Sequence, residues 1–337
     1  MKILFVGDPH LRINKFSLAM EFIGWLDKLI EEQRPDLVVN LGDSLDTHAV
    51  IRSEVLNELM KHIYRVLDQG IPYVYLKGNH DQYTPKDSRY HAMLSFKGRI
   101  ENLFIVDAIQ DLFGMTFVPF LADNGAFPTE TRSICIAHQT FLGADYGAVN
   151  AEDGVDPDKV SADVIISGHI HKMHTLGKVQ YVGSPFAQDA SDVNQIKGIT
   201  VFDSDTFKRT FFQCPLPSWR SFSFEIGIDG SVEELHYGLS AAMTGTKDHW
   251  VVELRGPKAE IVNYLDSDEY GDLNRSVSIK LKTVFTDKHK QKVSIRASSM
   301  DQVVREFVEK VYSGALDKKV LLSRADAILK EVRSQTT

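Results

Sequence analysis

The sequence predicts an α/β protein in which parallel strands deliver polar side chains to one edge of a sheet. Apolar runs of strand length alternate with segments of helical periodicity, starting at residue 3. This order is typical of βαβ units, whose parallel strands are covered by helices. Five of the apolar runs end in carboxylate, amide or imidazole side chains. Because functional loops in such folds follow the carboxyl ends of the strands, we expect these side chains to meet.

The central stretch of this pattern is Gly78-Asn79-His80-Asp81, which follows the apolar run 73–76. On its own, such a stretch is typical of an ordinary turn. Four other apolar runs end in a similar way, and they supply Asp8 and His10, Asp43 and Asp46, His138, and His169 and His171. The repetition indicates a metal site.

Seven side chains are the candidate ligands: Asp8, His10, Asp43, Asn79, His138, His169 and His171. Imidazoles mixed with carboxylates and one amide, without a thiolate, suit Mn, Fe or Zn better than all-oxygen Mg or Ca sites. Seven ligands are too many for one tetrahedral ion, whereas two ions that share one carboxylate use them all. Two-metal sites lower the pKa of a bound water and stabilise both oxygens of a phosphoryl displacement. The expected reaction is therefore phosphoester hydrolysis.

In this order, the five motifs resemble those of the calcineurin-like metallophosphoesterase superfamily, over residues 1 to about 213. Within it, residues 42–47 and 181–185 resemble the SbcD branch, whose members are nuclease subunits of DNA double-strand-break processing complexes in bacteria and phages. The resemblance implies a Mn-dependent DNA exonuclease and endonuclease of recombination and repair. It also implies a partner, a coiled-coil ATPase of the SbcC type.

The resemblance further implies the domain organisation. A four-layer α/β/β/α metallophosphoesterase sandwich is expected at residues 1–215, and the boundary falls at Pro215-Leu216-Pro217-Ser218. A small α+β capping domain that contacts DNA is expected at residues 216–297. C-terminal helices follow at residues 298–337, where the family places a helix-loop-helix that docks on the ATPase.

The same resemblance implies a role for each site residue. Asp8, His10, Asp43 and His171 would hold one divalent ion, and Asp43, Asn79, His138 and His169 the other, with Mn as the expected metal and Mg as the second choice. A hydroxide between the ions would attack phosphorus. His80 would stabilise the charge on the transferring group and could protonate the leaving oxygen, and Asp81 would orient His80. Asp46 stands where many relatives carry a second catalytic histidine, although bacterial SbcD-like members also have aspartate there.

Several elements can be placed along the chain. Helices are expected from Ser17 to Pro35, with Ser17 as N-cap, from Ser53 to about Gly70, with Ser53 as N-cap, over residues 88–96, and from Pro257 to about residue 265. Residues 103–106, 112–118 and 133–137 are expected to be strands, and residues 139–163 a long functional loop. Strands at 178–182, 198–202 and 209–213 are expected to finish the sheet in antiparallel order.

Composition places the protein among ordinary globular chains. It has 337 residues, a formal net charge of −8 and two cysteines, Cys135 and Cys214. No run reaches the ~20 apolar residues of a membrane span, and no signal peptide is recognisable. We therefore expect a cytoplasmic protein without membrane contact, and the resemblance implies a bacterium or a phage-infected host.

An acidic protein can contact DNA only through a local positive surface. The stretch 275–296 has seven basic residues and one acidic residue. The expected DNA contacts are Lys280, Lys282, Lys288, Lys290, Lys292 and Arg296, together with His48 on the loop that leaves the metal site. A solvated strand face would explain the same lysines.

Apolar stripes at residues 303–312 and 320–332 predict two C-terminal helices, which pack either on their own chain or on the ATPase. The resemblance also implies a homodimer, because relatives of this branch often dimerise through helices after the second and third motifs; covering the sheet would explain the same helices. Two other functions compete with a nuclease: a phosphoesterase acting on a small or protein phosphoester, and a scaffold with a vestigial site. The filled ligand positions argue against the scaffold.

Overall fold

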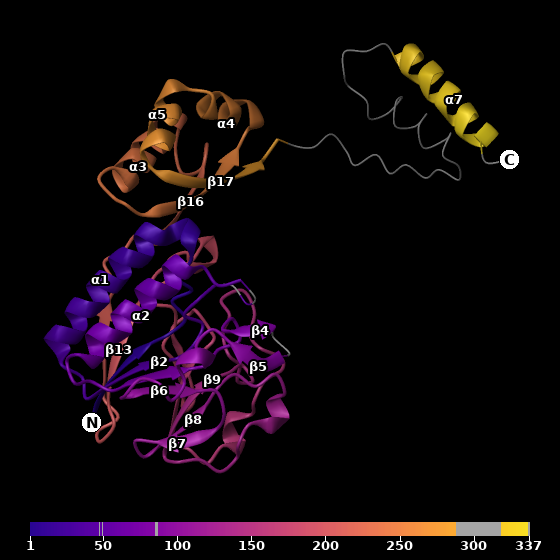
Figure 1. Cartoon of the computed structure of the whole chain (residues 1–337). Coiled ribbons are helices and arrows are strands. Elements are labelled where there is room, and N and C mark those ends of the chain that lie inside the picture. Colours follow the sequence, from indigo (N-terminus) through magenta and orange to yellow (C-terminus); the bar gives the residue numbers. More distant parts are fainter. Residues whose placement is uncertain (47, 49, 85–86, 288–317, 336–337) are drawn as a thin grey trace. The chain divides into compact units, whose positions relative to one another are not determined.

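The computed structural model describes residues 1–46, 48, 50–84, 87–287 and 318–335 (Figure 1). Packing divides the chain into two units: residues 1–255 with 259–284, and residues 256–258 with 285–337. The first unit contains two six-stranded sheets and one three-stranded sheet. The expected boundaries at residues 215/216 and 297/298 stay predictions.

The first sheet has the order β14-β13-β1-β2-β3-β6. Its strands are β1 (Lys2–Val6), β2 (Leu37–Asn40), β3 (Tyr73–Leu76), β6 (Leu103–Val106), β13 (Gly198–Asp203) and β14 (Arg209–Gln213). The first four pair in parallel, whereas β13 is antiparallel to β1 and β14 to β13. Every residue of β2 and β3 is buried, as expected for parallel strands covered on both faces.

The second sheet has the order β11-β12-β10-β9-β8-β7. Its strands are β7 (Gln110–Leu112), β8 (Met115–Val118), β9 (Ile134–His138), β10 (Val164–Gly168), β11 (His174–Leu176) and β12 (Val179–Tyr181). The inner strands β8, β9, β10 and β12 pair in parallel, and β7 and β11 form antiparallel edges.

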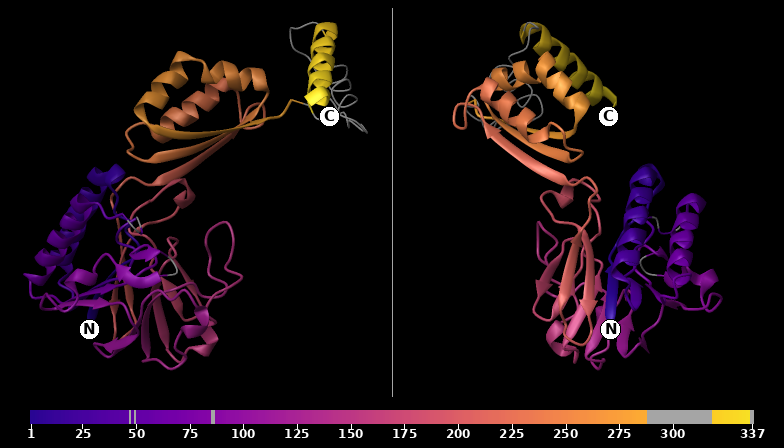
Figure 2. Two further views of the ribbon diagram at one scale, coloured as in Figure 1. Left: turned by 45° about the vertical axis from the view of Figure 1, so that its right-hand side comes forward. Right: turned by 90° about the vertical axis from the view of Figure 1, so that its left-hand side faces the viewer.

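Two helices, α1 (Phe16–Gln33) and α2 (Ser53–Leu67), lie side by side on the first sheet (Figure 2). The expected N-caps are wrong. Lys15 and Arg52 occupy those positions, without side-chain capping hydrogen bonds, so that Ser17 and Ser53 lie inside the helices. A 3-10 turn, Ile13–Lys15, leads directly into α1, which is why the chain enters that helix earlier than Ser17.

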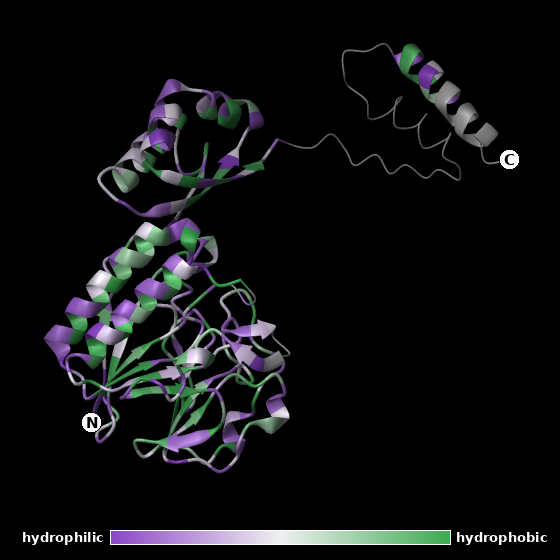
Figure 3. Cartoon of the chain, in the orientation of Figure 1, coloured by the Kyte–Doolittle hydropathy of each residue, from purple (hydrophilic) through white to green (hydrophobic). Residues whose placement is uncertain are grey.

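Three buried apolar clusters fill the spaces between the layers. Because successive side chains of a strand point to opposite faces of the sheet, neighbouring residues belong to different clusters. In β1, Leu4 and Val6 pack with α1 and α2, whereas Ile3 and Phe5 pack between the two sheets. The third cluster covers the other face of the second sheet. Figure 3 shows the resulting apolar strands inside a more polar exterior.

These layers confirm the α/β class. Within the described residues, the layer on the outer face of the second sheet is built from loops with the 3-10 turns Asn124–Ala126 and Pro157–Lys159, where an α-helix was expected. The long loop 139–163 belongs to this layer. It buries Phe141, Ala144 and Val155, so the loop is packed although it has no helical or strand period.

Two other expectations are corrected. Residues 88–96 do not form a helix but contribute to a hairpin of β4 (Gln82–Thr84) and β5 (Asp87–His91), followed by a 3-10 turn, Leu94–Phe96. Strand-favouring residues such as Tyr83, Thr84 and Tyr90 outweigh any helical period there. The three late strands do not finish a single sheet, because β12 pairs in parallel with β10 while β13 and β14 join the first sheet.

A small α/β region follows residue 218. It contains β15 (Trp219–Glu225), α3 (Val232–Met243), β16 (His249–Gly256), α4 (Lys258–Leu265), α5 (Asp268–Ser276) and β17 (Ser278–Phe285). The strands β15 and β16 run parallel, and the three helices share an apolar core with the sheet β15-β16-β17. Helix α3 was not predicted, although Ser231 and Glu234 form a capping box at its start.

Helix α7 (Lys318–Gln335) is the described element of the second unit, and it covers the predicted helix at 320–332. The predicted helix at 303–312 lies outside the described residues. Among the helices that the structure describes, none has the length and apolar character needed to cross a bilayer.

Candidate metal centre

The candidate ligands come from the carboxyl ends of five strands in two sheets. Asp8 and His10 follow β1, Asp43 follows β2 and Asn79 follows β3, all in the first sheet. His138 ends β9, and His169 and His171 follow β10, in the second sheet. The structure therefore brings all seven predicted ligands together.

Four of these ligands have left-handed backbone conformations. The φ angles are 35° at Asp8, 42° at His10, 50° at Asp43 and 80° at His169. Such conformations cost roughly 1–2 kcal/mol per non-glycine residue and persist only where the surrounding structure holds them. The chain turns sharply after each strand, and these turns direct the ligands towards one another.

Two glycines allow the loops after β2 and β3 to touch. A Cβ on Gly78 would lie 2.2 Å from Oδ1 of Asp43, and one on Gly42 would lie 2.7 Å from Nδ1 of His138. Gly42 also has a φ of +104°, which L side chains rarely adopt. Positions 42 and 78 therefore both need glycine, because a Cβ at either one would clash with the groups packed around Asp43.

One group of ligands consists of Asp8, His10 and His171, whose donor atoms lie within 4.8 Å of one another. The Nε2 atoms of His10 and His171 are 3.0 Å apart. Both carboxylate oxygens of Asp8 accept the backbone N–H of His169, at 2.9 and 3.0 Å.

A second group consists of Asp43, His138 and His169, also within 4.8 Å. Asn79 belongs to it, because its Oδ1 lies 2.8 Å from Nδ1 of His169 and 3.0 Å from Nε2 of His138. Nδ1 of His138 donates to the carbonyl of Leu41 at 2.6 Å, which directs Nε2 into the group.

Asp43 lies between the two groups. Its Oδ2 is 3.4 Å from Nε2 of His138 and 3.8 Å from Nε2 of His10. This is the position that a carboxylate shared by two ions would need.

Burial governs the charges in this cluster. Burial lowers the pKa of His10 and of His171. Burial and the charge of His138 together lower the pKa of His169 to about 3. Neutral imidazoles have a free lone pair for a cation. Burial also raises the pKa of Asp8 to about 7.

His138 and Asp43 behave differently because they pair. Burial lowers the pKa of His138, but the Asp43 carboxylate outweighs it and raises that pKa to about 9. Burial raises the pKa of Asp43, but His138 outweighs it, and the pKa falls below its ordinary value. Without a metal, a proton on His138 therefore balances the Asp43 charge.

His80 stands at the edge of the first group. Its Nδ1 donates to the backbone carbonyl of Asp46 at 3.0 Å, and its backbone N–H donates to Oδ1 of Asp43 at 2.7 Å. His10, Asp46 and His80 form a third group of donor atoms within 4.8 Å. The carbonyl fixes Nδ1 as the protonated atom, which makes Nε2 of His80 the atom available for proton transfer.

Asp46, expected as a catalytic residue, and His48, expected as a DNA contact, also have defined partners. Oδ1 of Asp46 is 3.7 Å from Nδ1 of His10 and 3.2 Å from the guanidinium of Arg12. His48 stacks on His80, with ring centroids 4.6 Å apart and planes inclined by 18°. His48 thus covers one face of the histidine for which we expect a catalytic role.

The expected role of Asp81 is corrected. This buried carboxylate accepts the hydroxyl of Tyr75 at 2.7 Å and the backbone N–H groups of Gly78 and Asp43 at 2.8 and 3.0 Å. Asp81 therefore fixes the loops that carry Asp43 and Asn79, and the carbonyl of Asp46 orients His80 instead.

The predicted DNA contacts are only partly within the described residues. Lys280 and Lys282 are exposed on β17, and their spacing of two places them on the same face of the strand. Lys282 forms an ion pair with Glu253 at 2.6 Å. Lys288, Lys290, Lys292 and Arg296 lie outside the described residues.

Some residues that support the centre were not predicted. Arg12 and Gln188 contact each other at 3.0 Å, and Lys197 donates to the carbonyl of His171 at 2.7 Å. Arg12 follows His10 by two residues, which is a usable sequence signal. For Gln188 and Lys197, no motif or period marks a contact with distant loops.

The residues present fit two divalent cations. Four imidazoles, two carboxylates and one amide converge, and Asp43 lies between two groups of them. This mixture of nitrogen and oxygen donors without thiolate is typical of Mn, Fe or Zn sites. The metal identity does not follow from the donor set.

Comparison with known proteins gives consistent results. The sequence profile of the calcineurin-like phosphoesterase family matches residues 1–173. "Putative phosphoesterase 244L" of Invertebrate iridescent virus 6 is 35% identical over 201 residues, which cover 54% of this chain and 69% of that protein. "Putative phosphoesterase 078R" of Invertebrate iridescent virus 3 is 28% identical, over 55% of this chain and 57% of that protein.

A third relative is the "Exonuclease subunit 1" of Enterobacteria phage T4, which is 24% identical over 229 residues, 63% of this chain and 67% of that protein. The profile covers slightly more than half of the chain, and its range includes all seven candidate ligands. The chain therefore belongs to the calcineurin-like phosphoesterase family.

Proposed function

We propose that this protein is a metal-dependent DNA nuclease subunit that hydrolyses phosphodiesters with two divalent ions, Mn by preference. The observation that carries the proposal is the position of Asp43 between two groups of buried ligands, with His80 at the edge of one of them. The similarity to a phage exonuclease subunit supports DNA as the substrate.

When bound, two divalent ions neutralise charge on the phosphate and lower the pKa of water. The chain itself supplies orientation and a proton donor. The carbonyl of Asp46 and the ring of His48 hold His80, so that its Nε2 can face a leaving oxygen. General acid catalysis of this kind contributes about 10²–10⁴-fold.

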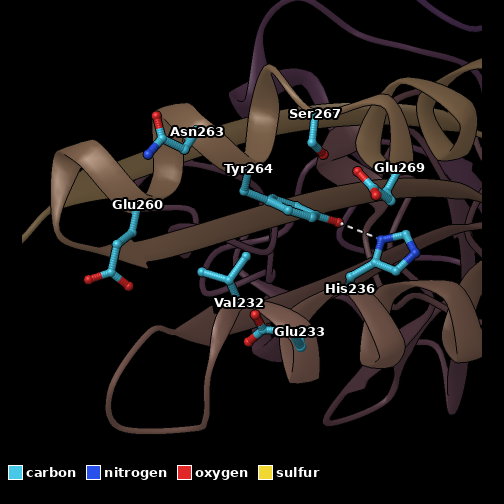
Figure 4. A pocket seen from close by; sticks show the side chains of 8 residues that line it. All are labelled: Val232, Glu233, His236, Glu260, Asn263, Tyr264, Ser267 and Glu269. Atoms are coloured by element: carbon cyan, nitrogen blue, oxygen red, sulfur yellow. Dashed lines mark hydrogen bonds between the residues drawn. The ribbon is translucent and has the colours of Figure 1, made fainter.

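The small region after residue 218 is the proposed DNA-contacting part, and its surface is not uniformly basic. A pocket of about 490 Å³ between α3, α4 and α5 is lined by Glu233, Glu260 and Glu269 (Figure 4). Carboxylates repel phosphates, so this pocket is a poor DNA surface. Lys280 and Lys282 on β17 are the better candidates among the described residues.

The proposal includes partners that the family resemblance suggests. An ATPase of the SbcC type would bind through the C-terminal helices, of which α7 is described. A homodimer would use α2, since the hairpin β4–β5 takes the place of the second expected helix.

One alternative has an observation in its favour. Two viral relatives are named only as phosphoesterases, and both have a higher identity to this chain, 35% and 28%, than the 24% of the phage exonuclease subunit. In this alternative, the centre acts on a small or protein phosphoester.

The deciding experiment is release of nucleotides from end-labelled linear duplex DNA with Mn²⁺, for the wild type, His80→Ala and His236→Ala. The last variant is the matched control, because His236 bonds to Tyr264 in the small region and not to the centre. We expect cleavage by the wild type and the control, and strongly reduced cleavage by His80→Ala. Hydrolysis of an aryl phosphodiester without DNA cleavage would support the alternative.

A further inference from the structure

A buried ion pair lies behind the candidate metal centre. Nζ of Lys197 is 2.6 Å from Oδ1 of Asp192, and the exposed fractions of the two side chains are 4% and 2%. Buried ion pairs contribute little to stability, because the loss of hydration offsets the attraction between the charges. The presence of this pair therefore calls for another explanation.

The lysine contacts the turn that carries a ligand. Its Nζ donates to the backbone carbonyl of His171 at 2.7 Å and to the hydroxyl of Ser184 at 2.9 Å. The same carbonyl also accepts the backbone N–H of Ser184 at 3.0 Å. The backbone of His171 is thus held from two directions.

The aspartate contacts the other turn through one residue. Oδ2 of Asp192 accepts the backbone N–H of Gln188 at 2.7 Å. The side chain of Gln188 then donates to the carbonyl of Pro9 at 3.0 Å and accepts from Arg12 at 3.0 Å. Pro9 is the residue between Asp8 and His10.

The ion pair consequently connects the two turns that supply Asp8, His10 and His171. Asp8 and His10 have positive φ angles, and so does His169 in the other turn. Strained turns of this kind keep their geometry only when surrounding contacts determine it. Hydrogen bonds at the backbone of Pro9, Gln188 and His171 provide such contacts.

We propose that the Lys197–Asp192 pair is a positioning device that sets the distance between His10 and His171 and so determines the affinity of one of the two cation sites. The inference rests on the proposed two-ion centre but not on DNA as the substrate. Loss of supporting contacts around metal ligands typically lowers metal affinity by about 10–100-fold.

The test is the double variant Lys197→Met/Asp192→Asn, which removes both charges together and keeps similar volumes. Mn²⁺ binding is measured by calorimetry without DNA, and the free energy of unfolding is measured by urea titration without metal. We expect one Mn²⁺ site to weaken by about 10–100-fold and the other to stay within about threefold, and the urea titration shows whether the variant is folded before metal is added.

The matched control is Asp27→Leu/His62→Leu, which removes a pair with a 2.6 Å contact between α1 and α2. This control should leave both Mn²⁺ affinities unchanged. Gln188→Leu is the second test variant, because it breaks the link to Pro9 without removing a charge, and it should weaken the same site as the double variant does.

Wild-type affinity at both sites in the double variant, or in Gln188→Leu if the double variant does not fold, would overturn the inference. A wild type that binds fewer than two ions would overturn it as well, together with the two-ion centre. A wild type that binds two ions but does not cleave DNA would refute only the choice of substrate.

Discussion

Replacing Gly78 with alanine tests whether close contact between two loops forms the centre. The new Cβ would lie 2.2 Å from Oδ1 of Asp43, 2.6 Å from its backbone nitrogen and 2.7 Å from Cε1 of His138. All three distances are far below van der Waals contact, so Asp43 must move. Overpacking of this kind costs about 1–3 kcal/mol of stability, and displacement of Asp43 should weaken both Mn²⁺ sites.

Gly24→Ala is the matched control. Gly24 lies inside α1, and a Cβ there would meet no atom within 4 Å. Alanine in a helix interior is favoured over glycine by about 0.5–1 kcal/mol, so this variant should be more stable than the wild type. Urea unfolding and Mn²⁺ calorimetry measure both variants. If Gly78→Ala bound two Mn²⁺ ions with wild-type affinity, Asp43 would not be a shared ligand and the assignment would be refuted.

Three further predictions concern other parts of the protein. Because Asp43 raises the pKa of His138 to about 9, Mn²⁺ must displace a proton below that pH. The affinity of the centre for Mn²⁺ should therefore increase with pH between 6 and 8. Calorimetry in buffers of different ionisation enthalpy should show that a proton is released on binding. Binding without proton release would contradict the pairing of His138 with Asp43. Asp81→Ala should lower stability by about 3 kcal/mol through three lost hydrogen bonds, whereas reduced turnover at unchanged stability would restore its expected role beside His80. Lys280→Glu/Lys282→Glu should weaken duplex DNA binding and flatten its salt dependence while aryl phosphodiester hydrolysis is kept; unchanged DNA affinity would exclude this face of β17.

The ligands were predictable because each ends an apolar run, and strand ends in α/β folds converge. Chain order alone therefore predicted the seven candidate ligands that the fold brings together. Asp81 was assigned a wrong partner because sequence proximity to His80 says nothing about the direction of a side chain after a sharp turn. Lys197 and Asp192 escaped prediction for a related reason: a buried lysine looks like any surface lysine until the fold places it against a distant carbonyl. The helix expected at residues 88–96 failed because strand-favouring residues such as Tyr90 pair with β4 instead.

The division of ligands between the sheets explains how strained turns can form a precise centre. The first group takes Asp8 and His10 from the first sheet and His171 from the second. The second group takes Asp43 and Asn79 from the first sheet and His138 and His169 from the second. Each group is therefore complete only when the apolar cluster between the sheets, with Phe5 and Phe117, is packed. Packing of that cluster therefore brings the turns of the two sheets together, and hydrogen bonds at Pro9, Gln188 and His171 then fix the backbone around the first group.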